Sequence, residues 1–450
     1  MKKAVKQLAE KALRGGLYNK VVLPKHYANA VAQNIKHGFP ARRLKVIGVT
    51  GTNGKTSTCY LIHSMLLAAG YKAGLMTTVA YGVGKNIQPQ IHHMTSQPIG
   101  LLLERIEKMK AEGMDILVLE VTSHALAQFR TMGVPFDIAV MTNVTHEHLD
   151  YHGTFGAYLG AKLKLFKLAN RNKHGHRIGI VNADDENAAV FADAIENVLA
   201  YTLDPKATGA VAAPRKLKLT PRGSTYETEI KGVKLKLKCN LPGSFNVANS
   251  LAAASVGVAL GLEAKQIEAG IANLDNVEGR MTRVDEGQSF DVIVDFAHTP
   301  DSFEKLFKDL RPVVKGRLIA LFGSAGRRDE SKRAIQGRLA GKYADLVVVT
   351  EEDDRDIDGT EIMNQIAHGA EESGKVRDQD LFLVHNRTQA IELALMQAKK
   401  GDTVILLGKG HEKTIERAVG SGGTKDPDNP WEEHPWDEIG TTRKLLKTIK

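Results

Sequence analysis

The segment VIGVTGTNGKTST, residues 46–58, decides which fold the sequence predicts. Its first four residues are apolar or small and predict a buried strand, and residues 51–54 predict a tight turn. Residues 57–69 predict a helix with Leu61, Met65 and Ala68 on one face. A strand, a glycine turn and a helix N-terminus together present backbone N–H groups to an anion. The segment therefore predicts a loop that binds phosphate.

Lys55 and Thr56 give this loop its chemistry. The lysine supplies a positive charge for a β- or γ-phosphate, and the threonine hydroxyl suits Mg²⁺. The pattern is not strict, because Val49 stands where the usual phosphate-binding loop has glycine. The alternative is a glycine turn that binds nothing, and the strand before the turn and the helix after it count against that alternative. The residues expected to contact a nucleotide are Gly51, Thr52, Asn53, Gly54, Lys55, Thr56 and Ser57.

Length and composition limit the class of protein. A chain of 450 residues with 42% apolar residues is long enough for two or three domains with sizeable cores. The sequence has no run of about eighteen apolar residues that would predict a membrane-spanning helix, and no apolar signal core. Its two cysteines, Cys59 and Cys239, lie far apart, which favours a reducing compartment. These features predict a cytoplasmic protein.

The net charge of +9 is concentrated at the N-terminus. Residues 1–45 hold eleven Lys or Arg and one acid, Glu10, and the rest of the chain is nearly balanced. Residues 1–44 predict a short basic extension of two helices separated by Gly15-Gly16, one with an apolar face of Val5, Leu8, Ala12 and Leu13, the other with Tyr27, Val31 and Ile35. We expect it to be a lid packed on the next domain, with a contact to anionic phospholipid headgroups as the alternative. No basic pattern in the sequence indicates nucleic-acid binding.

Two α/β domains are predicted after this extension, at residues 45–280 and 281–450. The first has strand-like segments at 115–121, 137–143 and 177–182 with helical patterns between them, which predicts a doubly wound, mostly parallel sheet. Alternation in residues 209–239 predicts antiparallel hairpins on the edge of that sheet. A helix is predicted from Ser244 onward.

The C-terminal domain is predicted to be Rossmann-like. A segment rich in Gly, Pro and Asp, residues 420–435, predicts a mobile loop. Strands are expected at residues 291–296, 317–322, 345–350, 381–384 and 403–407, and a helix at 391–399.

Glu120 and His148 are the candidate metal ligands beside the phosphate-binding loop. Glu120 ends one predicted strand, and His148 lies shortly after the next, so both are expected at the sheet edge where Thr56 also lies. Oxygen and imidazole groups around a nucleotide phosphate suit Mg²⁺. The spacing of His146, His148 and His152 is not that of a zinc site, and no cysteine is near.

Several further motifs occur in order along the chain. They are TGTNGKTS (50–57), EVTSHALAQFR (120–130), TN (142–143), HLDYHG (148–153), AK (161–162), NADD (182–185), GSFNVAN (243–249), GRM (279–281), DFAHTPD (295–301) and GKGHE (408–412). Together these motifs, which span residues 45–450, resemble those of the Mur ligases, most closely the MurE type. Several independent motifs in the same order are far more specific than one phosphate-binding loop.

The resemblance implies an ATP-dependent ligase that joins a carboxylate to an amine through an acyl phosphate, in peptidoglycan precursor synthesis. Charge builds on the transferred phosphoryl group, and Lys55, Arg280 and Mg²⁺ suit its stabilisation. By resemblance, Asn249 contacts adenine, Asp295 contacts ribose, and ATP lies in the cleft between the last two domains. The resemblance also implies a carbamylated Lys162 that holds a second Mg²⁺ with Glu120 and His148. An ordinary solvated lysine is the alternative for Lys162.

The acceptor-substrate residues implied by the resemblance are Thr95, Ser96, Ser123 and Arg130. Ser123 and Arg130 are expected on one helix face, where Arg130 could clamp a carboxylate. A surface salt bridge is the alternative for Arg130. The segment Thr95-Ser96-Gln97-Pro98 stands where the family usually has Thr-Thr-Pro.

The residues implied to bind the incoming amino acid are Arg355, Gly408 and Glu412. Four acids in succession, residues 351–354, predict a negative patch that favours an ammonium group, and hence a diamino acid, either meso-diaminopimelate or L-lysine. The alternative is a solvated loop whose acids cap the helix near Glu361.

The chain departs from the family pattern at its N-terminus. The family has a complete domain there that anchors the uridine nucleotide, whereas only residues 1–44 precede the phosphate-binding strand here. We expect UDP-MurNAc-dipeptide as the acceptor, with a lipid-linked or non-UDP muropeptide as the alternative, and a monomeric enzyme. A folylpolyglutamate-synthetase-like ligase and a non-catalytic nucleotide-binding module are the rival functions.

Overall fold

The computed structural model of the chain describes residues 17–90, 95–145, 147–206, 211–220, 222–419 and 430–449. The chain forms two compact units that divide between Asp275 and Asn276, and the short segments 219–222 and 241–243 group with the second unit. Within the described residues, no helix is both long enough and apolar enough to cross a bilayer. The division into domains at residues 44 and 280 stays a prediction.

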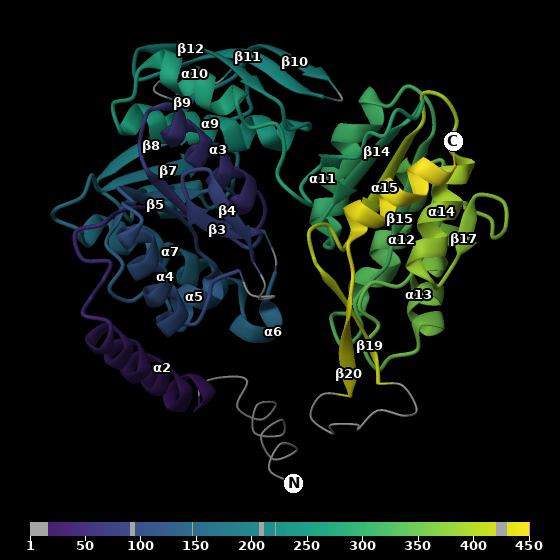
Figure 1. Cartoon of the computed structure of the whole chain (residues 1–450), viewed down its shortest axis with the longest axis horizontal. Coiled ribbons are helices and arrows are strands. Elements are labelled where there is room, and N and C mark those ends of the chain that lie inside the picture. Colours follow the sequence, from purple (N-terminus) through teal and green to yellow (C-terminus); the bar gives the residue numbers. More distant parts are fainter. Residues whose placement is uncertain are drawn as a thin grey trace. The chain divides into compact units, whose positions relative to one another are not determined.

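The first unit alternates strands and helices (Figure 1). Its helices are α2 (Leu17–Lys36), α3 (Lys55–Ala68), α4 (Ile99–Ala111), α5 (Ser123–Ala127), α6 (Leu149–His152), α7 (Phe155–Arg171), α8 (Ala188–Ala192), α9 (Ser244–Ala259) and α10 (Ala264–Ala272). Its strands are β1 (Lys45–Thr50), β2 (Ala73–Met76), β3 (Ala80–Val83), β4 (Asn86–Pro89), β5 (Ile116–Glu120), β6 (Phe136–Met141), β7 (Ile178–Asn182), β8 (Asn197–Tyr201), β9 (Val211–Ala212), β10 (Arg215–Thr220), β11 (Gly223–Ile230) and β12 (Val233–Cys239).

Nine of these strands form one sheet in the order β4-β3-β2-β5-β1-β6-β7-β8-β9. In this spatial order, every neighbouring pair from β2 through β5, β1, β6, β7 and β8 to β9 is parallel. At the other edge, β3 pairs antiparallel with both β2 and β4. β1 lies between β5 and β6, so the segments that follow these three strands meet at one sheet edge. The predicted doubly wound, mostly parallel sheet is confirmed.

Helices cover both faces of this sheet, with α3 and α9 on one side and α4 and α7 on the other (Figure 1). β1 has one exposed residue, Lys45, followed by five buried ones, as a central parallel strand requires. The core on the α4 and α7 side includes Val46, Leu117, Leu103 and Phe166, all fully buried. The buried sheet supports the loop after β1 on a rigid base.

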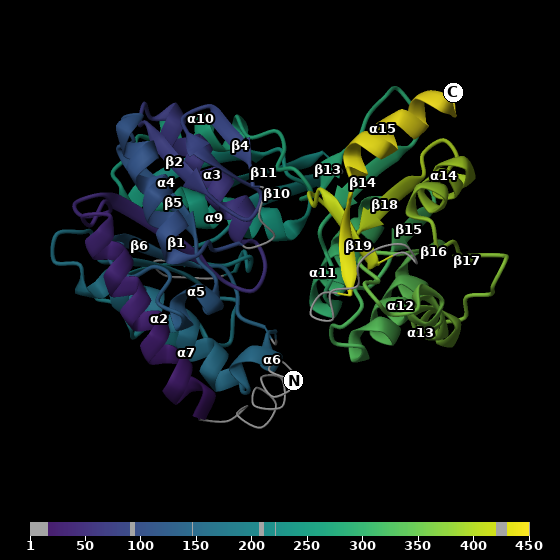
Figure 2. The ribbon, with the colours of Figure 1, turned by 60° about the horizontal axis from the view of Figure 1, so that its bottom comes forward.

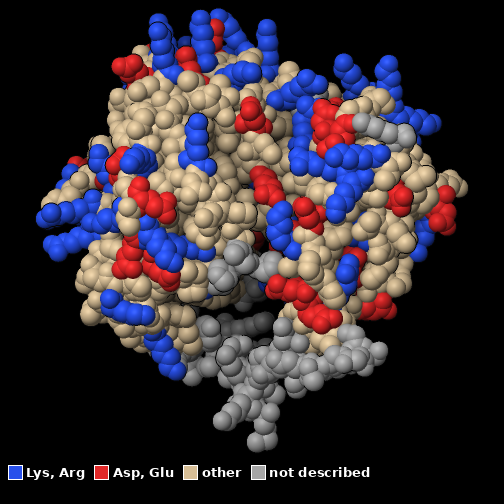
Figure 3. Space-filling model, in the orientation of Figure 1, with Lys and Arg blue, Asp and Glu red and all other residues tan. Residues whose placement is uncertain are grey.

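The predicted hairpins of residues 209–239 form a separate sheet. β10, β11 and β12 make a three-stranded sheet of their own, and only the short β9 joins the edge of the large sheet, so the expected placement on that edge was wrong for the hairpins. Alternation in β12 buries Leu235 and Leu237 on one face and exposes the lysines on the other, which is compatible with a sheet that covers the unit without joining the large sheet. Figure 3 shows Lys and Arg side chains along the upper edge, over β10–β12 of Figure 1.

The N-terminal segment contributes helix α2. Its prediction as a helix that ends before Gly38 is confirmed, although the helix begins ten residues before Tyr27 and includes Pro24. The other predicted helix, with Val5 and Leu8, lies outside the described residues. Figures 1 and 2 both show α2 along the side of the unit that carries α4 and α5.

The second unit is another α/β layer structure (Figure 2). Its strands are β13 (Thr282–Arg283), β14 (Asp291–Asp295), β15 (Leu318–Phe322), β16 (Leu346–Val349), β17 (Leu381–Leu383), β18 (Thr403–Leu407), β19 (Thr414–Ala418) and β20 (Trp431–Pro435). Its helices are α11 (Pro300–Leu310), the 3₁₀ helix η1 (Arg311–Val313), α12 (Ser331–Tyr343), α13 (Gly359–Glu372), α14 (Arg387–Gln397) and α15 (Glu438–Thr448).

Six strands of this unit pair in the order β13-β14-β18-β15-β16-β17, and all pairs except β13–β14 are parallel. The five predicted strands and the Rossmann-like layering are confirmed. The predicted loop at residues 420–435 was wrong in its last part, because Trp431–Pro435 is strand β20 and pairs with β19. Residues 420–429 of that loop lie outside the described residues.

Candidate active site

The loop after β1 has the geometry of an anion-binding turn. Gly54 is the N-cap of α3 and adopts φ +84°, a left-handed conformation that favours glycine. A Cβ added at Gly54 would lie 2.4 Å from Oδ1 of Asn249 on α9, so the loop and α9 are in close contact. The Lys55 ammonium donates to the Thr52 carbonyl oxygen at 2.7 Å. The first turn of α3 therefore opens directly at the loop, as the sequence predicts.

The end of β6 holds this loop in place. Asn143 Oδ1 accepts a hydrogen bond from the Asn53 N–H at 2.9 Å, and Asn143 Nδ2 donates to the Asn53 carbonyl oxygen at 3.0 Å. The Thr142 hydroxyl donates to the same carbonyl at 2.6 Å, and the Thr52 N–H donates to the Asn143 carbonyl at 2.7 Å. These bonds preorganise the loop before any ligand binds.

Glu120 joins the loop to its neighbouring strand end. Its carboxylate, only 2% exposed, accepts from the Thr56 hydroxyl at 3.0 Å. It also accepts from the N–H and the hydroxyl of Thr78, both at 3.0 Å. Thr56 and Glu120 are thus brought together as predicted, and this pair of oxygen donors fits Mg²⁺.

Lys162 is a buried lysine whose ammonium lies against the same loop. Its side chain is 2% exposed, and Nζ donates to the Gly51 carbonyl oxygen at 2.5 Å. Nζ also lies 4.6 Å from the centre of the Tyr158 ring, whose hydroxyl is 2.9 Å from the Thr52 hydroxyl. Burial, followed by the charge of Lys55, lowers the pKa of Lys162 well below its ordinary value. The alternative for Lys162, an ordinary solvated lysine, was therefore wrong.

His148 lies in an exposed turn close to these groups. It adopts φ +54°, which is uncommon for a residue with a side chain. Its ring centre lies 4.7 Å from that of His124 and 6.1 Å from that of Tyr158, so Tyr158 neighbours both His148 and Lys162. His146, considered for zinc, lies outside the described residues.

The predicted acceptor-substrate residues gather at a pocket beside Glu120. Thr95, Ser96, Glu120 and Arg130 all line it. Arg130 was expected on one helix face with Ser123, and this was wrong, because α5 ends at Ala127 and Phe129 takes φ +56° in the following turn. Arg130 instead reaches back, and its NH1 donates to the Ser96 carbonyl oxygen at 2.8 Å.

Ser123 is already engaged on the other side of this edge. It is 1% exposed, and its hydroxyl lies 3.0 Å from Nε2 of His152. The Ser96 hydroxyl accepts from the N–H and the hydroxyl of Thr122, both at 3.1 Å. Ser96 therefore lines the pocket, whereas Ser123 is not among its lining residues.

Arg280 and Asp295 lie together in the second unit. The Arg280 guanidinium carbon is 4.6 Å from the centre of the Phe296 ring. Asp295 accepts from the N–H groups of Met281 and Ala297, both at 2.7 Å. Burial raises the pKa of Asp295, and the Arg280 charge and these two hydrogen bonds oppose that rise.

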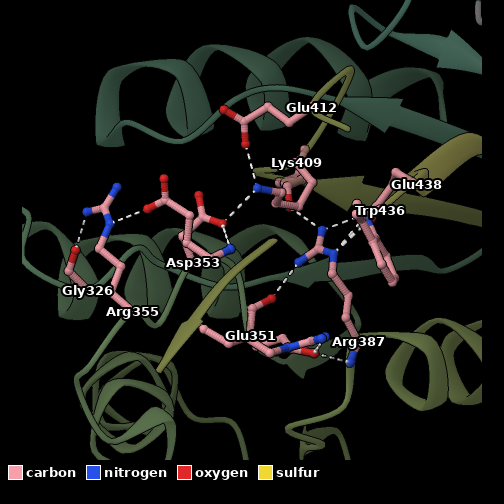
Figure 4. Close-up of polar contacts among 12 residues, drawn as sticks. Gly326, Glu351, Asp353, Arg355, Arg387, Lys409, Glu412, Trp436 and Glu438 are labelled. Atoms are coloured by element: carbon pink, nitrogen blue, oxygen red, sulfur yellow. Dashed lines mark hydrogen bonds and ion pairs between the residues drawn. The ribbon is translucent and has the colours of Figure 1, made fainter. Parts of the chain in front are cut away.

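The acidic run after β16 is not an open negative patch, so that expectation was wrong (Figure 4). Glu351 pairs with Arg417 at 2.7 and 2.8 Å, and Asp354 pairs with His385 at 2.7 Å. Asp353 accepts from the Lys409 ammonium at 2.9 Å. Each of these three carboxylates has a basic partner in the same unit, although Asp354 Oδ1 has no hydrogen-bond partner among the described residues. The helix-cap alternative was also wrong, because Asp358 caps α13 through the Thr360 N–H.

Glu352, like Asp354 at Oδ1, has a buried carboxylate oxygen without a donor among the described residues. It is 6% exposed, and among the described residues its Oε2 has no hydrogen-bond partner. A Cβ added at Gly408 would lie 2.6 Å from this oxygen, so Gly408 leaves open the space beside it. A buried carboxylate oxygen without a donor is costly unless a cation or a donor arrives.

Lys409 and Glu412 form a buried pair beside Gly408. The Lys409 ammonium lies 2.6 Å from Glu412 and 2.9 Å from Asp353. Burial alone would lower the pKa of Lys409, but these two carboxylates outweigh it and raise the pKa. Burial raises the pKa of Glu412, the Lys409 ammonium opposes that rise, and the negative charge of Asp353 adds to it.

Arg355, expected to hold a substrate carboxylate, is engaged within the second unit. Its Nε donates to Glu416 at 2.5 Å, and its NH1 donates to the Gly326 carbonyl oxygen at 2.6 Å (Figure 4). Arg355 adopts φ +57°, which is uncommon for a residue with a side chain.

Motif reasoning missed three residues of the first site: Asn143 as a loop clamp, Thr78 and Tyr158. Thr78 follows the short strand β2, which was not predicted, at the edge already known to carry the site. Tyr158 precedes Lys162 by four residues on α7, and this spacing places two residues on one helix face. Both signals were present in the sequence.

The sequence matches two known domain families in succession. Residues 49–257 match the Mur ligase middle domain, and residues 279–410 match the Mur ligase glutamate ligase domain. A UDP-N-acetylmuramyl-tripeptide synthetase of Roseiflexus sp. (strain RS-1) is 39% identical over 424 residues, which cover 92% of this chain and 80% of that protein. The UDP-N-acetylmuramoyl-L-alanyl-D-glutamate--2,6-diaminopimelate ligase 1 of Clostridium acetobutylicum is 37% identical, with 83% and 74% covered.

Solved structures agree with these matches. The structure of a UDP-N-acetylmuramoyl-L-alanyl-D-glutamate--2,6-diaminopimelate ligase has a TM-score of 0.62 and 28% identity, covering 90% of this chain and 78% of that one. A Mycobacterium tuberculosis folylpolyglutamate synthase has a TM-score of 0.68 at 17% identity, covering 85% and 92%, which shows a shared fold alone. By its domain matches and its relatives over most of its length, the chain belongs to the Mur ligase family.

Proposed function

We propose that this chain joins a diamino acid to the free carboxylate of UDP-MurNAc-dipeptide, in peptidoglycan precursor synthesis. As a Mur ligase it is an ATP-dependent acid–amino-acid ligase, and the family uses ATP and Mg²⁺. The observation that carries the proposal is the convergence of Lys55, Thr56, Glu120 and Lys162 at one loop. Relatives at 37–39% identity whose names specify tripeptide synthesis or diaminopimelate ligation support the choice of reaction.

The first chemical step is phosphoryl transfer. The dipeptide carboxylate attacks the γ-phosphorus of ATP, and the bond between that phosphorus and the β–γ bridging oxygen breaks. ADP departs as the leaving group, and the dipeptide becomes an acyl phosphate. The loop N–H groups and Lys55 hold the phosphates, and bound Mg²⁺ would neutralise charge on the phosphoryl oxygens at Thr56 and Glu120. Asn249, next to Gly54, is proposed to contact the adenine. Arg280 is proposed to stabilise charge on the transferred phosphoryl group, and Asp295 to contact the ribose.

The second step forms the amide. The neutral amine of the incoming amino acid attacks the acyl carbon, the carbon–oxygen bond to phosphate breaks, and the amine loses a proton. Arg130, with Thr95 and Ser96 in the same pocket, is proposed to orient the acceptor carboxylate for the first step.

Lys162 is proposed to act as a carbamate. A lysine with a lowered pKa has a larger neutral fraction, and only the neutral amine attacks CO₂, releasing one proton. The product keeps one N–H for the Gly51 carbonyl and gains two anionic oxygens. These oxygens suit a second Mg²⁺, with Glu120 and His148 as the other candidate ligands.

Glu352 is proposed to recognise the distal ammonium of the diamino acid. Its Oε2 is buried without a hydrogen-bond partner among the described residues, beside the space that Gly408 leaves open, whereas Glu351 and Asp353 are bonded to Arg417 and Lys409. Both meso-diaminopimelate and L-lysine carry this ammonium. Recognition of the distal carboxylate of diaminopimelate by Arg355 would require it to exchange its present partner, Glu416.

A charge-removing variant tests this choice. Glu352→Gln should raise the KM of the diamino acid by about 10- to 100-fold, the cost of a charge-assisted hydrogen bond, with the KM of ATP unchanged. Glu361→Gln, an exposed acid on α13, is the matched control. If the KM of the diamino acid were unchanged in Glu352→Gln, Glu352 would not be the residue that recognises the distal ammonium. Arg355→Ala then separates the two candidates, because a loss confined to diaminopimelate assigns Arg355 to its distal carboxylate.

A further inference from the structure

The turn that carries Arg130 is strained and held from outside. It runs from Phe129 to Gly133, both with positive φ, at +56° and +82°. A positive φ is unfavourable for phenylalanine, because its Cβ approaches the following carbonyl oxygen. Such a turn persists only where surrounding contacts determine it. Helix α2 contacts this turn at both of its ends.

Tyr27 of α2 contacts the first residue of this turn. Its ring packs edge-to-face on the Phe129 ring, with centres 5.4 Å apart at 85°. Edge-to-face packing is a favoured arrangement for aromatic pairs. Phe129 directly precedes Arg130, so the Tyr27 ring fixes the backbone from which the guanidinium projects.

Asn34 of α2 fixes the other end of the turn. It is 1% exposed, and its Nδ2 donates to the carbonyl oxygens of Ala30 at 2.9 Å and Met132 at 3.1 Å. A Cβ added at Gly133 would lie 2.2 Å from Asn34 Oδ1, so the helix and the turn are in direct contact there. One buried amide thus bridges α2 and the turn.

A third observation places α2 near the guanidinium itself. Burial, and then the positive charge of Arg130, lower the pKa of His26, the neighbour of Tyr27. The Arg130 guanidinium meanwhile lines the pocket with Thr95 and Ser96. Helix α2 therefore faces the acceptor pocket through the turn.

We propose that α2 is a positioning element of the acceptor site, in which Tyr27 and Asn34 hold the turn so that Arg130 points into the pocket. The inference rests on the proposed function, because it takes the acceptor carboxylate as the ligand of Arg130. The helix acts through Arg130 and does not itself touch the reacting atoms.

The test compares steady-state kinetics of variants of the full chain with UDP-N-acetylmuramoyl-L-alanyl-D-glutamate as the varied substrate. Tyr27→Ala and Asn34→Asp should each raise its KM about two- to tenfold, the range for coupled neighbours, with kcat and the KM of ATP unchanged. Asn34→Asp keeps the shape and removes the donor. Tyr27→Phe keeps the ring and should restore the wild-type KM. Ile35→Ala, 65% exposed on the same helix, is the control and should change nothing.

A second background separates positioning from general stability. In an Arg130→Ala enzyme, Tyr27→Ala should give no further rise in KM, because the group through which it acts is gone. The same fold-rise in both backgrounds, or an unchanged KM in Tyr27→Ala and Asn34→Asp, would overturn the inference. An equal rise in the KM of ATP and the KM of the acceptor would also overturn the inference, because a general structural effect of the substitution would raise both. If the wild-type chain does not use this acceptor at all, the proposed function fails instead.

Discussion

Replacing Arg387 with methionine should destabilise the second unit far more than an ordinary ion-pair mutation. The Arg387 and Glu438 side chains are both 0% exposed, and their closest atoms are 2.6 Å apart. Arg387 also donates to the carbonyl oxygens of Glu351 at 2.9 Å and Leu407 at 2.8 Å (Figure 4). It therefore ties together the chain segments that lead into Glu352 and Gly408.

The magnitude follows from what the substitution leaves behind. Removing one partner of a buried ion pair costs about 3–5 kcal/mol, because the other charge stays buried without compensation. Glu438 would keep only the Trp436 Nε1 donor, at 2.7 Å, among the side-chain contacts of this cluster. For a unit of this size each kcal/mol lowers the melting temperature by about 2–4 °C, so we expect a fall of roughly 6–20 °C.

Urea unfolding followed by tryptophan fluorescence measures the free energy of unfolding of the second unit. Both tryptophans of the chain, Trp431 and Trp436, belong to the second unit. Arg338→Met, which breaks the half-exposed pair with Glu372, is the control and should cost under about 1 kcal/mol. Arg387→Met with Glu438→Gln should recover part of the loss. If Arg387→Met cost no more than Arg338→Met, the reasoning about this buried pair would be refuted.

Four further outcomes are expected. Gly54→Ala should abolish detectable ATP binding by calorimetry, because of its φ of +84° and the 2.4 Å approach of its Cβ to Asn249; retained affinity contradicts the loop geometry. Lys162→Ala should lose ligation and regain part of it with short carboxylates. For the wild type, CO₂-free buffer should lower the rate of ligation. The fall should be larger at lower pH, because protonation there removes the neutral amine of Lys162 that reacts with CO₂. If added bicarbonate restored the rate equally at every pH, this would count against the carbamate. Cys59 and Cys239, both buried, should resist iodoacetamide until unfolding, as mass spectrometry will show.

Local patterns predicted most of the fold. The segment around Lys55 and the strand-like runs ending at Glu120 and Asn182 were recognisable, because a buried parallel strand leaves a short apolar run in the sequence. The hairpins of β10–β12 were recognised as antiparallel, but their sheet was misplaced. Alternation specifies which face is buried, not which surface buries it.

The candidate site was predictable where residues follow strand ends and less so where partners come from distant segments. Glu120 and Thr56 meet as the sheet topology requires. The acidic run was misjudged, because its cations, Lys409 and Arg417, lie more than fifty residues further along the chain. Arg130 was misplaced because the backbone after α5 takes a positive φ at Phe129, where the sequence has neither glycine nor asparagine to indicate it.

The most direct test of the central claim is product formation by the purified chain with ATP and Mg²⁺. The assay offers UDP-N-acetylmuramoyl-L-alanyl-D-glutamate with a panel of amino acids, a lipid-linked muropeptide with the same panel, and a folate with glutamate. We predict that ADP release requires both the UDP-linked acceptor and a diamino acid, with a product equal in mass to the two joined with loss of water. ADP release that ignores the acceptor, preference for a neutral or acidic amino acid, or product only in the folate arm would contradict the account.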